Sequence, residues 1–311
     1  MGLFDRFFNK TNANSLIHST TIQLLEKFKM ETIIPSIKLT FERKGKISIT
    51  DSKLGGYPYL PKDFTYPVSS KGHPLKLLAQ LNFSQLPALV DFPSSGILQF
   101  YVLPNCDVGL PGRENLSNQD SFRVIYHKDI APNECMKYFP KIELIDDGYG
   151  AWFPFEGEFA IIGSVQDSFI TSATYEFDKK LAEFCEKNDM KSFYELYSTP
   201  WYGADKTMSK AEYKEFDKKK HELCDIIYPI FADETHRISG YPYFTQEDPR
   251  FYDASLRKYD TLLLQIASEY GNGPNTDEIM WGDAGIANFF INKENLKNLN
   301  FADVIYTWDC C

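Results

Sequence analysis

Apolar and polar residues alternate at 37–41 and 46–50, and this period predicts two half-buried strands. Further strands are predicted at 75–81, 96–103, 121–126, 141–145 and 159–165. Apolar residues at helical spacing predict a helix over about 14–30, with Asn14 as its cap. Two segments rich in Lys, Glu, Ala and Leu, 175–196 and 209–227, predict further helices, and Ser209 with Glu212 has the spacing of a capping box. We expect Pro229 to end the last helix. The pattern indicates an α+β fold that is predominantly β.

Three sequence blocks occur twice, in the same order. GGYPYL at 55–60 returns as SGYPYF at 239–244, LLAQL at 77–81 as LLLQI at 262–266, and SGILQFYV at 95–102 as AGIANFFI at 284–291. Such self-similarity is the signature of an internal repeat. It predicts two related strand-rich halves, about 35–165 and 229–311, with a helical insertion near 172–228. We expect the halves to bury their cores against each other, which makes residues 1–311 a single compact domain.

Each LLxQ block places one glutamine, Gln80 or Gln265, in a run of apolar strand residues. Burying an amide that has no hydrogen-bond partner costs about 1–3 kcal/mol, so both side chains need partners. One interpretation is structural, with Gln80 and Gln265 tying equivalent loops to the sheet. The other is functional, with the two amides facing a cleft between the halves.

Tryptophan and aspartate occur together at two places in the second half. Trp281 and Asp283 lie in a glycine-flanked segment just before a predicted strand, and Trp308 and Asp309 lie near the C-terminus. Two such pairs could line one concave ligand site, with apolar contact from the rings and orientation from the carboxylates. The alternative is that the tryptophans belong to the core and the aspartates cap turns.

The quoted blocks and their neighbours resemble the YwqG family of bacterial proteins. The first half carries GGxPxLP at 55–61, LAQLNxxxLP at 78–87 and GxLxF at 96–100. The second half carries GYP at 240–242, LLQI at 263–266, WGDAG at 281–285 and WDCC at 308–311. The resemblance implies a duplicated, β-rich, cytoplasmic protein, and it supplies no catalytic residues.

Composition and charge narrow the classes of partner. The chain has 311 residues, 43% of them hydrophobic, and a formal net charge of −10. A nucleic-acid-binding face needs the opposite charge, and no apolar run approaches the roughly 18 residues of a membrane span. Six cysteines without framework spacing fit a reducing cytoplasm, with the terminal Cys310 and Cys311 as packed thiols. We therefore expect no nucleic acid and no membrane as partner.

No signature of a known reaction is present in the sequence. It contains neither a phosphate-binding loop nor a Cys-x-x-Cys or Gly-x-Ser-x-Gly motif, and Asp233, Glu234 and His236 fit a solvated linker better than a metal site. We expect no metal and no cofactor. The hypothesis is a non-enzymatic cytoplasmic protein, immunity-type or regulatory, that binds a protein or a small molecule. The alternative is a hydrolase-like enzyme whose site lies at the junction of the halves, near Gln80, Gln265, Asp283 and Asp309.

Overall fold

The computed structural model describes residues 14–43, 45–201, 204–271 and 277–310. These residues belong to two compact units. One unit contains the chain up to Ile33 together with Phe169–Asp233, and the other contains Ile34–Ser168 and Glu234–Cys311. The fold is α+β and predominantly β, as the sequence predicts. The expectation of one compact domain stays a prediction.

The first unit is helical. Its elements are α1 (Asn14–Glu31), α2 (Phe177–Lys187), α3 (Lys191–Ser198), η4 (Ala204–Lys206) and α4 (Lys210–Phe231). The predicted helix at 175–196 is in fact two helices, and Asp189, with a φ of 55°, stands between them. The ring of Phe28 lies within 6 Å of three phenylalanine rings, those of Phe177, Phe184 and Phe231, which form the centre of this unit.

Helix α4 confirms its predicted start and corrects its predicted end. The Ser209 side chain accepts from the Glu212 N–H and the Glu212 carboxylate accepts from the Ser209 N–H, which completes the capping box. The helix continues through Pro229 to Phe231. A proline removes only one main-chain bond at its own position. Here that position lies in the last turn, where the Ala232 N–H still bonds the Tyr228 carbonyl.

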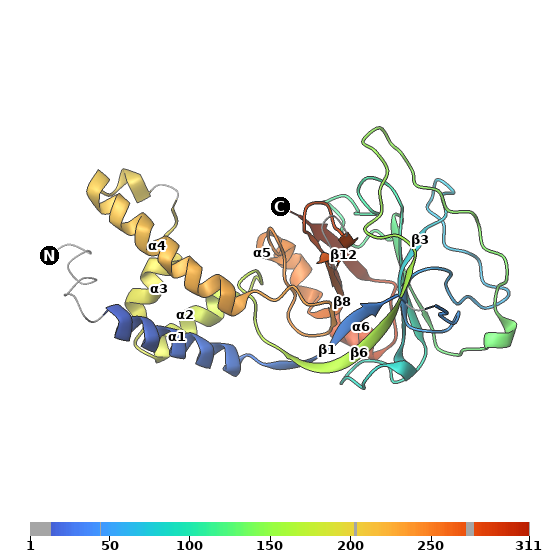
Figure 1. Ribbon diagram of the computed structural model, residues 1–311, viewed down its shortest axis with the longest axis horizontal. Coiled ribbons are helices and arrows are strands. Elements are labelled where there is room, and N and C mark those ends of the chain that lie inside the picture. The colour runs from blue at the N-terminus through green and yellow to red at the C-terminus, as the bar shows by residue number, and fades with distance from the viewer. Residues whose placement is uncertain (1–13, 44, 202–203, 272–276, 311) are drawn as a thin grey trace. The chain divides into compact units, whose positions relative to one another are not determined.

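The second unit is built on a ten-stranded antiparallel sheet, ordered β12-β11-β8-β7-β1-β6-β2-β3-β4-β5. Figure 1 labels β1, β3, β6, β8 and β12 of this sheet. Its strands are β1 (Ile34–Glu42), β2 (Lys53–Gly55), β3 (Lys76–Asn82), β4 (Ile97–Val102), β5 (Phe122–His127), β6 (Glu158–Ser168), β7 (Arg237–Ile238), β8 (Thr261–Ala267), β11 (Ile286–Ile291) and β12 (Val304–Asp309). A separate ribbon pairs β9 (Glu269–Tyr270) with β10 (Asp277–Ile279). Short helices complete the unit: η2 (Phe83–Gln85), η3 (Pro132–Glu134), α5 (Pro249–Tyr252), η5 (Ala254–Lys258) and α6 (Lys293–Lys297).

Two of the predicted strands are wrong. Residues 46–50 form a turn, because the Asp51 carboxylate accepts from the Ser48 N–H and because side-chain amides of β3 bond the carbonyls of Ile49 and Thr50. Residues 141–145 run as an extended surface segment, where Leu144 is 47% exposed. Alternation alone cannot separate such segments from strands that have a neighbour to pair with.

The same kinds of residue pair across neighbouring strands in the two parts of the sheet. Lys53 pairs with Gln80, which pairs with Gln99, and on the other side Arg237 pairs with Gln265, which pairs with Asn288. An extra residue interrupts the register at equivalent places, 78 in β3 and 263 in β8. These equivalences support the predicted duplication, which itself stays a prediction.

The long central strands cross between the two halves. Strand β1 precedes β2–β5 in the chain but pairs with β7 of the second half. Strand β6 precedes β7 in the chain but pairs with β2 of the first half. Strands β1 and β6 pair along their length, from Ile34 opposite Ser168 to Glu42 opposite Ala160. The expected repeat boundaries, 35–165 and 229–311, stay a prediction. In the chain, α2, α3 and α4 lie between β6 and β7.

Aromatic rings from both halves share one core. Phe100 on β4 lies 4.9 Å from Phe289 on β11, which stacks on Tyr306 of β12 at 4.4 Å. Phe122 of β5 lies 5.4 Å from Tyr306, which brings the two edge strands of the sheet close together. The C-terminal segment forms the strand β12, in which Val304, Ile305 and Tyr306 are fully buried and Trp308 is partly buried.

Candidate functional site

Gln80 sits on β3, fully buried, with four hydrogen bonds. Its Oε1 accepts from the Tyr59 main-chain N–H and from Gln99 Nε2, both at 2.8 Å. Its Nε2 donates to the carbonyls of Ile49 at 2.9 Å and Asp51 at 2.8 Å. The side chain therefore ties two separate loops to the sheet.

Gln265 makes the equivalent contacts in the second half. Its Oε1 accepts from the Tyr243 N–H at 2.7 Å, its Nε2 donates to the Thr235 carbonyl at 2.9 Å, and the side chain is fully buried. Tyr243 follows Tyr59 by 184 positions and Thr235 follows Asp51 by the same number. These main-chain partners favour the structural interpretation of Gln80 and Gln265 over the interpretation that they face a cleft.

A buried polar network around Gln99 was not singled out from the sequence. The Gln99 Oε1 accepts from the Tyr101 hydroxyl at 2.9 Å and lies 3.1 Å from His127 Nε2. Burial lowers the pKa of His127 to about 4, so the imidazole is neutral at physiological pH. Gln99 and Asn288 occupy the same position in the two copies of the third repeated block, each as a polar residue in an apolar run. This shared position is the feature of the sequence that could have indicated the network.

The structure brings Trp281 and Trp308 together, with ring centroids 5.9 Å apart. Trp152 joins them, 5.5 Å from Trp308. Two of the indole N–H groups bond main-chain carbonyls, that of Trp308 to Asp107 at 2.6 Å and that of Trp152 to Cys106 at 2.7 Å. Trp281 itself is fully buried. These contacts favour core packing for the tryptophans.

The two aspartates have different surroundings. Asp283 is exposed on a tight turn in which Gly282 and Ala284 both have positive φ. Asp309 is partly buried, and its carboxylate accepts from the main-chain N–H groups of Thr245 at 3.2 Å and Gln246 at 2.8 Å. Burial raises the pKa of Asp309, and these main-chain bonds partly oppose the shift. Asp309 thus holds a loop, and the described contacts do not join it to Asp283 as an acid–base pair.

His236, Cys106 and Cys185 are poorly placed for nucleophilic catalysis. His236 accepts from the Ala267 N–H at Nδ1 and faces the Glu269 carboxylate at Nε2, both at 3.0 Å, so neither nitrogen is available as a base. A hydrogen bond to Asp147 and burial raise the pKa of Cys106 to about 11, and burial does the same to Cys185. Protonated thiols are weak nucleophiles.

Within the described ranges no group of three His, Cys, Asp or Glu side chains could hold a metal ion, the segment around Asp233 and His236 included. None of the helices there is long and apolar enough to cross a bilayer. Cys310 is a free thiol, and Cys311 lies outside the described residues.

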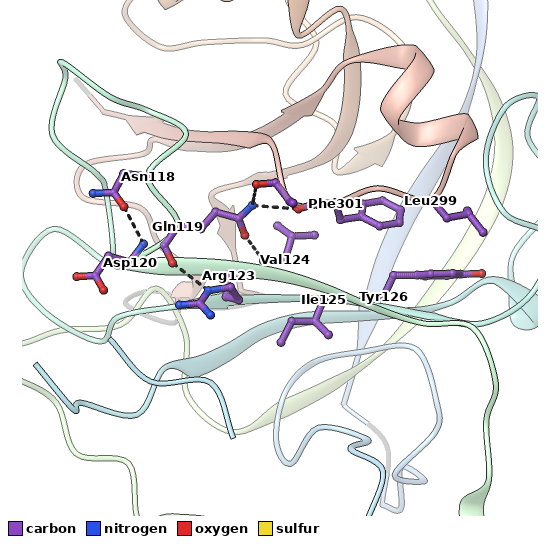
Figure 2. Close-up of a pocket in the computed structure, with 10 residues that line it drawn as sticks. Asn118, Gln119, Asp120, Arg123, Val124, Ile125, Tyr126, Leu299 and Phe301 are labelled. Atoms are coloured by element: carbon purple, nitrogen blue, oxygen red, sulfur yellow. Dashed lines mark hydrogen bonds between the residues drawn. The ribbon is translucent and has the colours of Figure 1, made fainter. Parts of the chain in front are cut away.

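A groove of about 650 Å³ follows the edge strand β5, which is the last strand of the sheet on its side (Figure 2). One wall is the strand itself, with Arg123, Val124, Ile125 and Tyr126. The opposite wall is the segment between α6 and β12, and the 118–120 turn closes one end. No sequence motif pointed to this groove, because its walls lie about 175 residues apart in the chain.

Gln119 spans this groove. Its Oε1 accepts from the Val124 main-chain N–H at 2.8 Å, while its Nε2 donates to the carbonyls of Phe301 at 3.0 Å and Ala302 at 3.1 Å (Figure 2). One primary amide thus bonds main-chain groups on both walls. The walls are separated by the width of a single amide.

Comparison with known families places most of this architecture in one family. A family model described as a domain of unknown function, DUF1963, matches residues 52–310. The chain belongs to this family. The DUF1963 match begins just before β2 and includes both halves of the sheet, the helical insertion and the groove residues. Among curated proteins no match was found. The finer resemblance to the YwqG family stays a prediction.

Proposed function

We propose that this protein is a non-enzymatic binding protein that receives part of a protein partner in the groove beside β5. The observation that carries the proposal is the Gln119 amide, which satisfies main-chain groups on both walls of an open groove. The groove is also free of the convergent carboxylate, imidazole or thiol groups that a reaction needs. Its described lining offers main-chain edges, apolar side chains, two amides, one arginine and one aspartate, Asp120, whose carboxylate is bonded to Ser70.

The buried polar groups support the same proposal. Gln80, Gln265 and Asp309 each bond main-chain groups of neighbouring loops, so they stabilise the scaffold that holds the groove. A cytoplasmic location, an immunity-type or regulatory role and an internal duplication are further parts of the proposal. The five described cysteines are all free, which agrees with a reducing compartment.

A hydrolase-like enzyme is the second candidate. The observation in its favour is Asp309, because a carboxyl group with a raised pKa is a common general acid. Both of its oxygens accept main-chain N–H groups, however, which is typical of a structural aspartate. An assay of ester, amide and phosphoester substrates on the full chain and on Asp309→Asn tests this candidate, which requires turnover that the variant loses.

Site-directed photo-crosslinking tests the binding proposal. Tyr126→p-benzoylphenylalanine places a photoreactive ring in the groove, and Tyr252→p-benzoylphenylalanine places the same ring at a position whose native side chain is 67% exposed and lies outside it. We expect irradiation of expressing cells to give a discrete protein adduct from position 126 that position 252 does not give. Identical adducts from both positions, or none from position 126, would contradict the proposal.

A further inference from the structure

We infer that the groove beside β5 takes an extended polypeptide segment as an additional strand, and that this segment places an acidic side chain next to Arg123. The inference rests on the proposed function and specifies the chemistry of the partner. It follows from the width of the groove, the direction of the main-chain groups on β5, the nature of its two faces and the charge of Arg123.

The Gln119 side chain measures the width of the groove. A primary amide has the same donor and acceptor chemistry as a peptide group. In this protein it reaches the Val124 N–H on one wall and the carbonyls of Phe301 and Ala302 on the other, with all three distances between 2.8 and 3.1 Å. A peptide group in the same plane would meet the same two walls. Beyond Gln119 the groove continues along β5 toward Tyr126 (Figure 2).

The main-chain groups of β5 are directed for strand addition. In an antiparallel pair, the N–H and C=O groups of alternate residues point toward the paired strand and away from it. Val124 points its N–H toward Gln119 and away from β4, so the groups of Tyr126, two residues on, point the same way. Strand β5 is at the end of the sheet, where no described strand pairs with that side. Such an edge is the usual acceptor of an added peptide strand.

The groove has an apolar face and a second face on which the charged Arg123 lies beside the apolar Ile125. Val124 and Tyr126 lie on the side of the 299–302 segment, where the Tyr126 ring is 5.4 Å from Phe301. Arg123 and Ile125 point to the other side of β5 (Figure 2). Side chains of an added strand alternate between two faces in the same way. We therefore expect a segment with apolar residues on the Phe301 side and polar ones on the Arg123 side.

Arg123 sets the charge of that polar side. Its Nε donates to the Gln119 carbonyl at 2.9 Å and its Nη2 to the Val68 carbonyl at 3.5 Å. Asp120 is the other charged residue of the groove lining, but its two oxygens accept from the Ser70 N–H and hydroxyl, and no ion pair joins it to Arg123 among the described residues. A guanidinium bonds carboxylates in a fixed, often bidentate geometry. An Asp or Glu of the added strand would supply this missing counter-charge.

A selection with the full chain tests the inference, using a phage-displayed library of random 12-residue peptides as the probe. We expect enriched peptides that alternate apolar and polar residues and carry an Asp or Glu at one polar position. Their binding should protect the β5 main chain from hydrogen exchange. N-methylation of two alternate amides of a selected peptide should weaken binding by about tenfold or more, since each main-chain bond contributes about 1 kcal/mol.

Replacing Arg123 tests whether it contacts the acidic residue of the bound peptide. Arg123→Gln should weaken binding of the acidic peptides by about fivefold and leave binding of their Glu→Gln versions unchanged, as for an exposed ion pair. Lys191→Gln, at a lysine whose side chain is 85% exposed on α3, serves as the matched control and should change neither. An equal loss for acidic and neutral peptides would mean that Arg123 acts only on the fold, and would overturn its assigned role.

The remaining outcomes separate this inference from the proposed function. Peptides that protect another region, that tolerate N-methylation, or that fail to enrich at all would overturn strand addition. A position-specific crosslink from residue 126 would still support a binding protein in that case, one that recognises a folded surface of its partner. If the crosslink also failed, the proposed function would fail with the inference.

Discussion

Replacement of Gln80 by leucine is the sharpest test of the scaffold. The change preserves much of the side-chain volume but removes an amide that is fully buried. It leaves the Tyr59 N–H and the carbonyls of Ile49 and Asp51 without their side-chain partner. Each unsatisfied buried group costs about 1–3 kcal/mol, and partial relaxation of the loops offsets some of the sum. We expect Gln80→Leu to lower the free energy of unfolding by about 2–4 kcal/mol.

Urea unfolding followed by tryptophan fluorescence measures this effect. Three of the four tryptophans lie in the sheet-containing unit and Trp201 lies in the helical unit, so a Trp201→Phe background restricts the signal to the sheet. With a slope of about 2–3 kcal/mol per molar urea, the midpoint should fall by about 1 M. Gln246→Leu, the same change at an exposed glutamine, should shift it by less than about 0.3 M.

An unchanged midpoint for Gln80→Leu would refute the reasoning, because four hydrogen bonds of a buried amide cannot vanish without a stability cost. If partner binding were lost at the same time, Gln80 would belong to a binding site and not to the scaffold. A large loss shared by Gln246→Leu would also refute it, since the cost would then come from the added apolar surface.

Three further predictions follow from other parts of the sheet unit. Deletion of residues 304–311 should abolish soluble expression or lower stability severely, because it removes the buried strand β12; a truncated chain with an unchanged melting midpoint would contradict this. The pKa of His127 lies near 4, below the ordinary value of 6.5, so the folded state favours the neutral imidazole. Stability should therefore be complete above pH 6.5 and fall by up to about 3 kcal/mol toward pH 4, a pH dependence of the urea midpoint that His127→Phe should reduce. Asp147→Asn should speed alkylation of Cys106 by iodoacetamide at pH 8, because the Asp147 carboxylate helps to raise the pKa of that thiol; mass spectrometry measures the rate, and an unchanged rate would contradict the assigned cause.

Local patterns predicted the elements that have strong periodicity or a complete cap. The helix from Asn14, the capping box at Ser209 and the strands around Gln80 and Gln265 all follow from residues within one segment. Alternation failed at 46–50 and 141–145, where no neighbouring strand is available to pair. A segment forms a strand only when a neighbouring strand can pair with it, and the tertiary structure decides whether such a neighbour is present.

The groove could not be predicted for a related reason. Its walls are β5 and the segment before β12, which only the near closure of the sheet brings together. Gln119 carries no motif, and its function as a bridge appears only when Val124 and Phe301 stand on its two sides. The crossing of β1 and β6 could not be predicted either, because neither strand contains any of the repeated blocks.

The two halves of the sheet have similar strand pairing around Gln80 and Gln265, but their polar networks differ. In the first half Gln99 Oε1 bonds the Tyr101 hydroxyl and faces His127. At the equivalent places the second half has Asn288 and Phe290, and the Asn288 Oδ1 is buried with no partner among the described atoms.

The difference continues to the sheet edges. His127, at the end of β5, packs into its own network, whereas Asp309, at the equivalent place on β12, bonds the loop at 245–246. Strand β12 is further engaged, because the Tyr306 N–H bonds the Leu116 carbonyl and the Trp308 indole bonds that of Asp107. The equivalent edge on β5 has the groove. The β12 edge is therefore bonded to loops along its length, whereas on the β5 edge the described side-chain bond is that of Gln119 to Val124, which is why the proposed strand addition is assigned to β5.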